Sequence, residues 1–282
     1  MIPMDNFEKW QRRLNQEKFT GIFRNEEKVR WQQIPLEKRI DLLKTIFENP
    51  IGNVDVMHPW YFRNKWAEAL LMIRNQAPVR LLELASGAND VIPRALAFAF
   101  NHPETSYVAA NTNKDLTKWF KNNVKDISIN IEIIEDDAKS IEDYAEKESF
   151  DFVVFEHAVN DIIFDTLCRE KGIDTVNVPW FDFYGDIIKF TNEAYENGSL
   201  ESIVKEKLLG IFASCLNVLK QGSYIIINHF MYQYDLDAGI NYNFWENVLP
   251  MTRKWVNEAG IGKEIFFDGF DPQWWMFIKK GE

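Results

Sequence analysis

Cysteine and histidine are scarce in this sequence. Its 282 residues include two cysteines and four histidines. Cys168 and Cys215 form no CxxC pair, so the sequence gives no support to a zinc cluster or a redox motif, and we expect a reduced protein without a disulfide framework. We therefore predict no metal site and a cytoplasmic location.

Excess positive charge and long apolar runs are absent as well. Lysine and arginine number 32 against 43 aspartates and glutamates, which gives a net charge of -11 at pH 7. An acidic chain is not attracted to nucleic acid or to an anionic membrane. The first residues lack a basic and then apolar leader, and no window approaches the ~18 uninterrupted apolar residues of a spanning helix. We expect a small-molecule substrate, no nucleic acid and no membrane as partners, and leave the oligomeric state open, a homodimer included.

Aromatic residues, in contrast, are plentiful. The chain has 22 Phe, 10 Trp and 9 Tyr, and 46% of its residues are hydrophobic. A chain of this length can bury one substantial core and a smaller accessory domain. The aromatic residues indicate a large aromatic core, an aromatic-lined pocket, or both.

The first 78 residues are predicted to be helical and to form a cap or lid, because amphipathic segments are separated by prolines. The expected helices cover residues 5–19, 24–33, 36–48 and 60–75. An aromatic run at residues 58–63 precedes the last of them. It makes Tyr61 a candidate for substrate binding, and the alternative is aromatic packing between cap and core.

From residue 79 onward, strand-like and helix-like segments alternate, which is typical of a parallel sheet covered by helices on both faces. The expected strands are residues 80–85, 106–110, 129–134, 151–156, 223–229, 263–267 and 274–279. The expected helices include residues 139–147, 203–219 with Gly222 as C-cap, and 250–259. We divide the chain into a cap, 1–78, and an α/β domain, 79–282, with a helical and aromatic insertion at 162–202.

Residues 79–90 are predicted to be a buried strand, a tight turn and the start of a helix. Gly87 permits a tight backbone, and Asp90 followed by Pro93 favours a helix start there. Such a turn opens backbone N–H groups and a helix N-terminus to a ligand. Glu83 lies within the strand, where a buried carboxylate needs a partner.

The segment from Glu83 to Asn89 resembles motif I of the class I S-adenosylmethionine-dependent methyltransferases. That family favours three alternating glycines, and this sequence has Ala85, Gly87 and Asn89 at those places. The resemblance implies a Rossmann-like, mostly parallel seven-stranded sheet closed by an antiparallel pair, with S-adenosyl-L-methionine as cofactor. It also implies that cofactor-binding residues lie in the turn. These are Glu83, Ala85, Ser86, Gly87 and Asn89.

Later landmarks of the same family follow in order. Asn111 and Thr112 end the second strand, where the family has an acid that holds the ribose hydroxyls; asparagine can still donate and accept hydrogen bonds. Asp137 and Ala138 follow the third strand and resemble the segment that contacts adenine, although Asp137 could equally cap the next helix. Glu156 ends the fourth strand and is a further cofactor-binding candidate.

Polar residues after the fourth and fifth predicted strands are candidates for catalysis, because ligands bind beyond the carboxyl ends of strands in open α/β sheets. If the acceptor must lose a proton, His157, Asp161 and His229 are the candidate bases, in that order. The alternative for a histidine at a strand end is a hydrogen-bonded structural role.

The insertion at 162–202 joins aromatic residues to acids. Its residues Trp180, Phe181 and Tyr184 are candidates for substrate binding, because aromatic faces and carboxylates can hold an amine or a flat ring. The alternative is that they pack the insertion against the cap.

Taken together, the sequence predicts an S-adenosylmethionine-dependent methyltransferase that methylates nitrogen or oxygen of a small molecule, such as an amine or aromatic acceptor. A methyltransferase-like binding protein without catalysis and an enzyme acting on a protein or carrier-bound acceptor remain alternatives. A nicotinamide dehydrogenase is the rival within this fold class, but its G-x-G-x-x-G pattern is missing because the turn holds one glycine.

Overall fold

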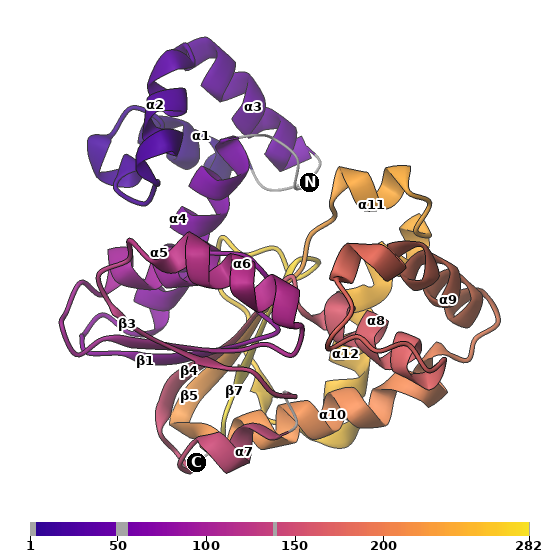
Figure 1. Ribbon diagram of the computed structural model, residues 1–282. Helices are drawn as coiled ribbons and strands as arrows, with labels where there is room; N and C mark the ends of the chain where they lie inside the picture. Colours follow the sequence, from indigo (N-terminus) through magenta and orange to yellow (C-terminus); the bar gives the residue numbers. More distant parts are fainter. Residues whose placement is uncertain (1–3, 49–55, 138–139, 282) are drawn as a thin grey trace.

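A computed structural model describes residues 4–48, 56–137 and 140–281, which form a seven-stranded sheet with helices on both faces (Figure 1). The strands lie in the order β3-β2-β1-β4-β5-β7-β6. Their bounds are β1 Arg80–Leu84, β2 Ser106–Ala110, β3 Asn130–Ile134, β4 Phe150–Glu156, β5 Leu219–Asn228, β6 Lys263–Glu264 and β7 Trp275–Lys279. The first five strands run parallel, and β7 pairs antiparallel with both β5 and β6. The predicted mostly parallel sheet with a closing antiparallel pair is confirmed.

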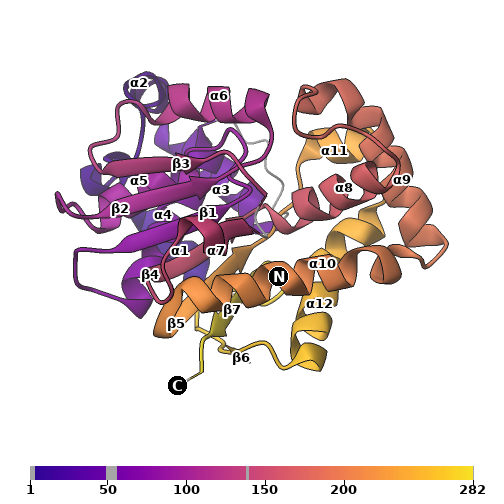
Figure 2. The same ribbon diagram turned by 60° about the horizontal axis from the view of Figure 1, so that its bottom comes forward.

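Helices from the two halves of the chain cover opposite faces of this sheet (Figure 1). On the first face lie α4 Met57–Ile73, α5 Val91–Ala99 and α6 Lys114–Val124. Beyond α4, away from the strands, lie α1 Met4–Arg13, η1 Glu17–Thr20, α2 Asn25–Gln33 and α3 Leu36–Glu48 (Figure 1). The second face carries α7 Ile141–Tyr144, α8 Val159–Glu170, η3 Trp180–Phe183, α9 Tyr184–Glu196, α10 Leu200–Val218 and α12 Tyr242–Ala259. The short helix α11, Gln233–Asp237, lies beside α9 (Figure 2).

Alternating side chains along each strand build these two cores. In β4, Phe152 and Val154 point to the α1–α6 side, and Val153 and Phe155 point to the α7–α12 side. This is the period of two expected of a strand buried on both faces. Every residue of β4 is buried, and its last residue, Glu156, lies at the carboxyl edge of the sheet.

Several predicted elements differ from the structure in extent. Helix α8 begins at Val159 and runs to Glu170, so the predicted segment 162–202 starts inside a helix. Gly222 is not a C-cap, since α10 ends at Val218 and the chain enters β5 directly. Gly222 instead has φ +72° within β5, next to the register shift between β4 and β5. A bulge explains the glycine there.

Among the described residues, no helix is both long and apolar enough to cross a lipid bilayer. The predicted helix start at Asp90 is confirmed, since α5 begins at the next residue. The Asp90 side chain makes no capping hydrogen bond, because its carboxylate is engaged by arginines, as described below.

Candidate functional site

The turns that follow the parallel strands meet at one edge of the sheet. Strands β1, β2 and β3 end in register at Leu84, Ala110 and Ile134, and β4 and β5 end in register at Glu156 and Asn228. The carboxyl edge of an open α/β sheet is the usual place for a ligand. Residues that lie far apart in the sequence are therefore brought together here.

Two of these turns use left-handed backbone conformations. Ala85 has φ +52° directly after β1, and His157 has φ +49° directly after β4, although neither is glycine. Gly87 has φ +58°, and a Cβ atom built on it would meet nothing within 4 Å. Left-handed conformations cost an L-residue roughly 1–2 kcal/mol and concentrate at functional sites. The two strained residues, Ala85 and His157, therefore indicate that this edge of the sheet is a functional site.

Polar side chains hold the β1 turn in place. Asn111 donates from its amide nitrogen to the Gly87 carbonyl at 3.1 Å, and Asn123 donates to the Ala88 carbonyl at 2.8 Å. Asn89 donates to Glu156 Oε2 at 3.0 Å and accepts from the Val91 N–H at 3.1 Å. Asn89 thus links the turn both to β4 and to the start of α5, a role that glycine has no side chain to fill.

A cavity of about 460 Å³ opens beside this turn. That volume is within the range of small-molecule sites. The N-terminal segment contributes Arg24, Glu27, His58, Pro59 and Arg63 to its lining, and the turn contributes residues 85–91. On the opposite side the lining includes Glu156, His157, Asp161, Tyr184, Tyr232 and Asp235.

Three carboxylates of this lining have no cationic partner among the described residues. Burial raises the pKa of Glu156 to about 8, and its Oε1 has no hydrogen-bond partner in the described structure. Burial, with the charges of Asp235 and Glu156, raises the pKa of Asp161 well above its ordinary value. Burial likewise raises the pKa of Asp235 to about 6, although the hydrogen bonds that it accepts from tyrosine hydroxyls, including that of Tyr184, lower the pKa. Like charges buried together disfavour ionisation.

The other carboxylates near the turn are fully paired. Arg63, buried in α4, contacts Glu27 and Asp90 at 2.6 Å each. Asp90 also contacts Arg94 at 2.6 Å and Arg24 at 3.4 Å. This cluster, called the arginine network below, ties α2 and α4 to the start of α5.

Three histidines lie close to the cavity, and burial keeps them neutral. Burial, with the charges of His229 and His58, lowers the pKa of His157 well below its ordinary value. Burial lowers the pKa of His229 and of His58 to about 3, in His58 with the charge of Arg63. The His157 and His229 rings stack at 5.4 Å. His157 and His58 line the cavity, whereas His229 lies behind them, with Nε2 3.2 Å from the Trp245 carbonyl oxygen.

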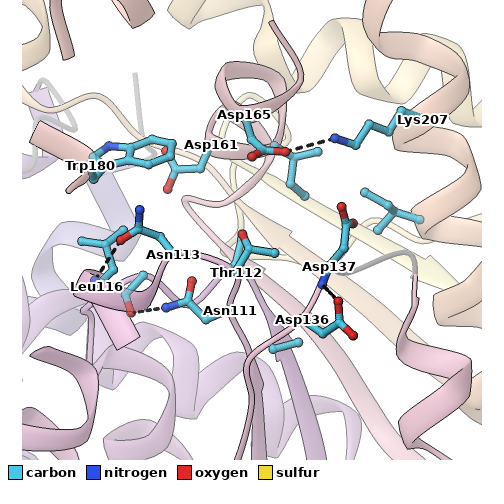
Figure 3. A pocket seen from close by; sticks show the side chains of 15 residues that line it. Asn111, Thr112, Asn113, Leu116, Asp136, Asp137, Asp161, Asp165, Trp180 and Lys207 are labelled. Carbon is cyan, nitrogen blue, oxygen red and sulfur yellow. Dashed lines mark hydrogen bonds and ion pairs between the residues drawn. The ribbon is translucent and has the colours of Figure 1, made fainter. Parts of the chain in front are cut away.

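A second, narrower cavity of about 50 Å³ shares Ala85 and Gly87 with the lining of the first. Figure 3 shows this second cavity from close by. Asn111, Thr112, Asp137 and Trp180 are among its lining residues. Asp137 contacts Arg169 at 3.2 Å, and α7 takes Ser140 as its N-cap, so Asp137 does not cap that helix. The predicted residue Ala138 lies outside the described residues.

Three predicted site residues lie away from both cavities: His229, described above, and Glu83 and Tyr61. Glu83 is sealed within the sheet, where the Tyr107 hydroxyl donates to it and burial raises its pKa well above the ordinary value. It can support the turn, but it does not face the ligand space. Tyr61 packs among aromatic rings, with Trp10 at 4.8 Å and Phe62 at 5.2 Å. This is the packing role that the sequence left open.

The remaining predicted residues lie in the lining of one or both cavities. They are Ala85, Ser86, Gly87, Asn89, Asn111, Thr112, Asp137, Glu156, His157, Asp161, Trp180, Phe181 and Tyr184. The sequence did not single out Tyr232, Tyr234 or Asp235, which follow β5. The sequence does contain a pattern that could have indicated them. Residues 231–235 hold two tyrosines and an acid shortly after a buried strand.

The chemistry of this arrangement follows from its charges. Buried carboxylates without cations can accept a proton or bind a positively charged ligand. No group of three or more potential metal-binding His, Cys, Asp or Glu side chains occurs in the part of the chain that the structure describes. The buried carboxylates therefore suit the site to a ligand that carries positive charge.

No protein-family model matches the chain, and no curated protein sequence matches it. Among solved structures, an S-adenosylmethionine-dependent methyltransferase from Aquifex aeolicus is 10% identical with a TM-score of 0.43, over 76% of this chain and 87% of that one. A Methanococcus maripaludis protein, provisionally described as a methyltransferase of the same cofactor, is 14% identical with a TM-score of 0.45, over 78% and 85%. A precorrin-6y C5,15-methyltransferase from Geobacter metallireducens is 12% identical with a TM-score of 0.38, over 71% and 70%. Similarities at this level do not assign a function to the chain.

Proposed function

We propose that this protein is an S-adenosyl-L-methionine-dependent methyltransferase that acts on a small molecule. The observation that carries the proposal is the left-handed turn at Gly87, which faces open space at the carboxyl edge of the sheet beside the unpaired Glu156 Oε1. A turn that approaches a ligand with its backbone needs glycine, and a buried carboxylate needs a positively charged partner. S-adenosylmethionine carries a sulfonium and an ammonium group.

The residues present fit this cofactor along the length of the two cavities. Glu156 would hold the ammonium group, and the backbone of residues 85–89 would lie along the cofactor. Asn111 and Thr112 would meet the ribose hydroxyls, with the Asn111 side chain already braced against the turn through its amide nitrogen. Asp137 would face the adenine in the narrower cavity, where Trp180 must move outward, because about 50 Å³ holds only a few water molecules.

The bound cofactor would supply an electrophilic methyl group. The chain then contributes alignment and proton removal, because a displacement of this kind is accelerated mainly by proximity and orientation. Asp161 lines both cavities and is the residue best placed to take a proton from an acceptor. His157 can assist, since burial keeps its imidazole neutral. His229 supports His157 from behind.

The N-terminal helices would form one wall of the site. Arg24, His58 and Pro59 all line the large cavity, which supports the role of residues 1–78 as a cap over a small acceptor. The volume of the cavity favours a small molecule over a protein segment.

Calorimetric titration with S-adenosylmethionine and S-adenosylhomocysteine tests the proposal. We expect one binding site per chain, and we expect Gly87→Ala to weaken binding at least tenfold, because the added methyl group enters the space beside the turn. Gly198→Ala is the matched control: Gly198 has φ +76°, nothing lies within 4 Å of its built Cβ, and it lines neither cavity. Absence of heat for both ligands at millimolar concentration would refute the proposal.

A further inference from the structure

Building on the proposed methyltransferase function, we propose that the acceptor is a cationic amine, held by Asp161 and Asp235 and by a row of aromatic rings. The row runs from the mouth of the large cavity to the end of β4. The distances between the centroids of consecutive rings are short throughout the row. They are 6.2 Å from Trp119 to Phe181, 6.3 Å from Phe181 to Tyr184, 5.7 Å from Tyr184 to Tyr234, 5.4 Å from Tyr234 to Tyr232 and 4.7 Å from Tyr232 to His157. These rings come from α6, the η3–α9 segment and the chain after β5.

The outer part of this row is exposed, which is unusual for large aromatic side chains. Phe181 is 52% exposed, Trp119 46% and Tyr234 41%. Exposed aromatic rings around a cavity present negative ring faces, which attract an organic cation. The ring row therefore offers an approach to the carboxylates for a positively charged molecule.

The carboxylates beside this row lack a positive charge. Asp235 is buried and accepts a hydrogen bond from the Tyr184 hydroxyl, and Asp161 accepts one from Asn160 Nδ2 at 2.8 Å. No lysine or arginine among the described residues forms an ion pair with either. Further in, Glu156 Oε1 is fully buried, lies in the same lining and has no partner in the described structure. The second cavity shows the contrast, since its Asp165 contacts Lys207 at 3.0 Å (Figure 3).

Charge separates the possible acceptors. A carboxylate acceptor would add a further negative charge beside Asp161 and Asp235, and a neutral alcohol would leave both uncompensated. An ammonium group compensates them and would pass its proton to the Asp161 carboxylate, which leaves the nitrogen with a lone pair. That lone pair would form the new bond between nitrogen and the methyl carbon, the bond between sulfur and the methyl carbon would break, and S-adenosylhomocysteine would leave. A methylated ammonium product still fits the same rings and acids, so more than one methylation of one nitrogen is expected.

The test compares three probes of similar shape and different charge: benzylamine, benzyl alcohol and benzoate. Their dissociation constants are measured at pH 7 by ligand-observed NMR titration, with the protein saturated with S-adenosylhomocysteine and again without it. We expect benzylamine to bind on the order of tenfold more tightly than benzyl alcohol, and benzoate to bind weakest. Asp235→Asn should abolish the preference, and Asp186→Asn, which changes an exposed acid of α9 outside the cavity lining, should retain it.

Tyr234→Leu serves as a second variant, since its exposed ring can be removed without opening the core; it should weaken benzylamine binding severalfold. Equal binding of benzylamine and benzyl alcohol, or a preference that survives both Asp235→Asn and Tyr234→Leu, would overturn the amine assignment. Calorimetry with S-adenosylmethionine on the same samples separates the two proposals. Cofactor binding without an amine preference sinks the acceptor class alone, and an amine preference without cofactor binding sinks the methyltransferase function.

Discussion

Two sets of buried carboxylates flank the same turn, and they differ in what compensates them. Glu27 and Asp90 sit in the arginine network, where every acid has a guanidinium within 3.4 Å. Glu156, Asp161 and Asp235 have no such partner among the described residues. A buried charge that is paired belongs to the fold, whereas a buried acid without a partner is costly unless a ligand supplies one. The difference distinguishes the scaffold from the site.

Removing the arginine from the paired set should have the largest effect. Arg63→Met leaves Glu27 and Asp90 without their closest cation, so we expect a loss of about 3–5 kcal/mol in the free energy of unfolding, measured by urea denaturation. Arg74→Met is the control, because Arg74 is 40% exposed and its partner Asp151 also contacts Lys220. That variant should lose less than about 1 kcal/mol. Equal losses would show that the network is not what anchors α4.

Neutralising an acid of the unpaired set should stabilise the ligand-free protein. The folded-state pKa of Glu156 is about 8 against an ordinary 4.5, so the folded state holds a proton that the unfolded state releases between these pH values. Stability therefore falls as pH rises from about 4.5 to about 8, by up to about 1.4 kcal/mol per pH unit. Glu156→Gln should remove this slope, gain roughly 3 kcal/mol at pH 7, and match the wild type near pH 4. If the free energy of unfolding changed with pH in the same way in both proteins, this prediction would be wrong.

The hydrogen bond between Tyr184 and Asp235 should matter more for stability than for the ligand. Tyr184→Phe removes one donor to a buried carboxylate, so we expect a loss of about 1 kcal/mol in the free energy of unfolding. It also removes nothing from the ring row, so benzylamine should still bind better than benzyl alcohol. Thermal denaturation and the NMR titration measure the two effects separately. Loss of the amine preference in this variant would mean that the hydroxyl contacts the ligand directly.

The smallest effect should come from relieving strain at the turn. Ala85→Gly replaces an L-residue at φ +52°, which costs about 1 kcal/mol as alanine, while the added freedom of glycine in the unfolded chain offsets about 0.4–1 kcal/mol. We therefore expect the free energy of unfolding, measured by urea denaturation, to rise by between zero and about 0.5 kcal/mol. Cofactor affinity should be retained. A marked loss of stability would show that the alanine methyl group packs in a way that the left-handed turn alone does not reveal.

Much of the sheet could be predicted from the sequence, because buried apolar runs and their alternation with helices are local signals. The positions of Gly87, Glu156 and Asp161 near one edge followed from the rule that parallel strands end together. Pairings across long sequence distances were out of reach: nothing local to Asp90 indicates that Arg63 neutralises it, and nothing local to Glu83 indicates the Tyr107 hydroxyl. Asp235 was missed for the same reason, since its importance depends on Asp161 across the cavity.

The central claim is that Glu156, an unpaired acid of the large cavity, receives the positively charged group of a cofactor. Calorimetry of S-adenosylmethionine binding at pH 7, repeated in buffers of different ionisation enthalpy, measures the protons released on binding. A cation bound beside Glu156 should drive its carboxyl, protonated at this pH, to ionise. The wild type should therefore release close to one proton more than Glu156→Gln. No binding, or equal proton release by the two proteins, would contradict the account.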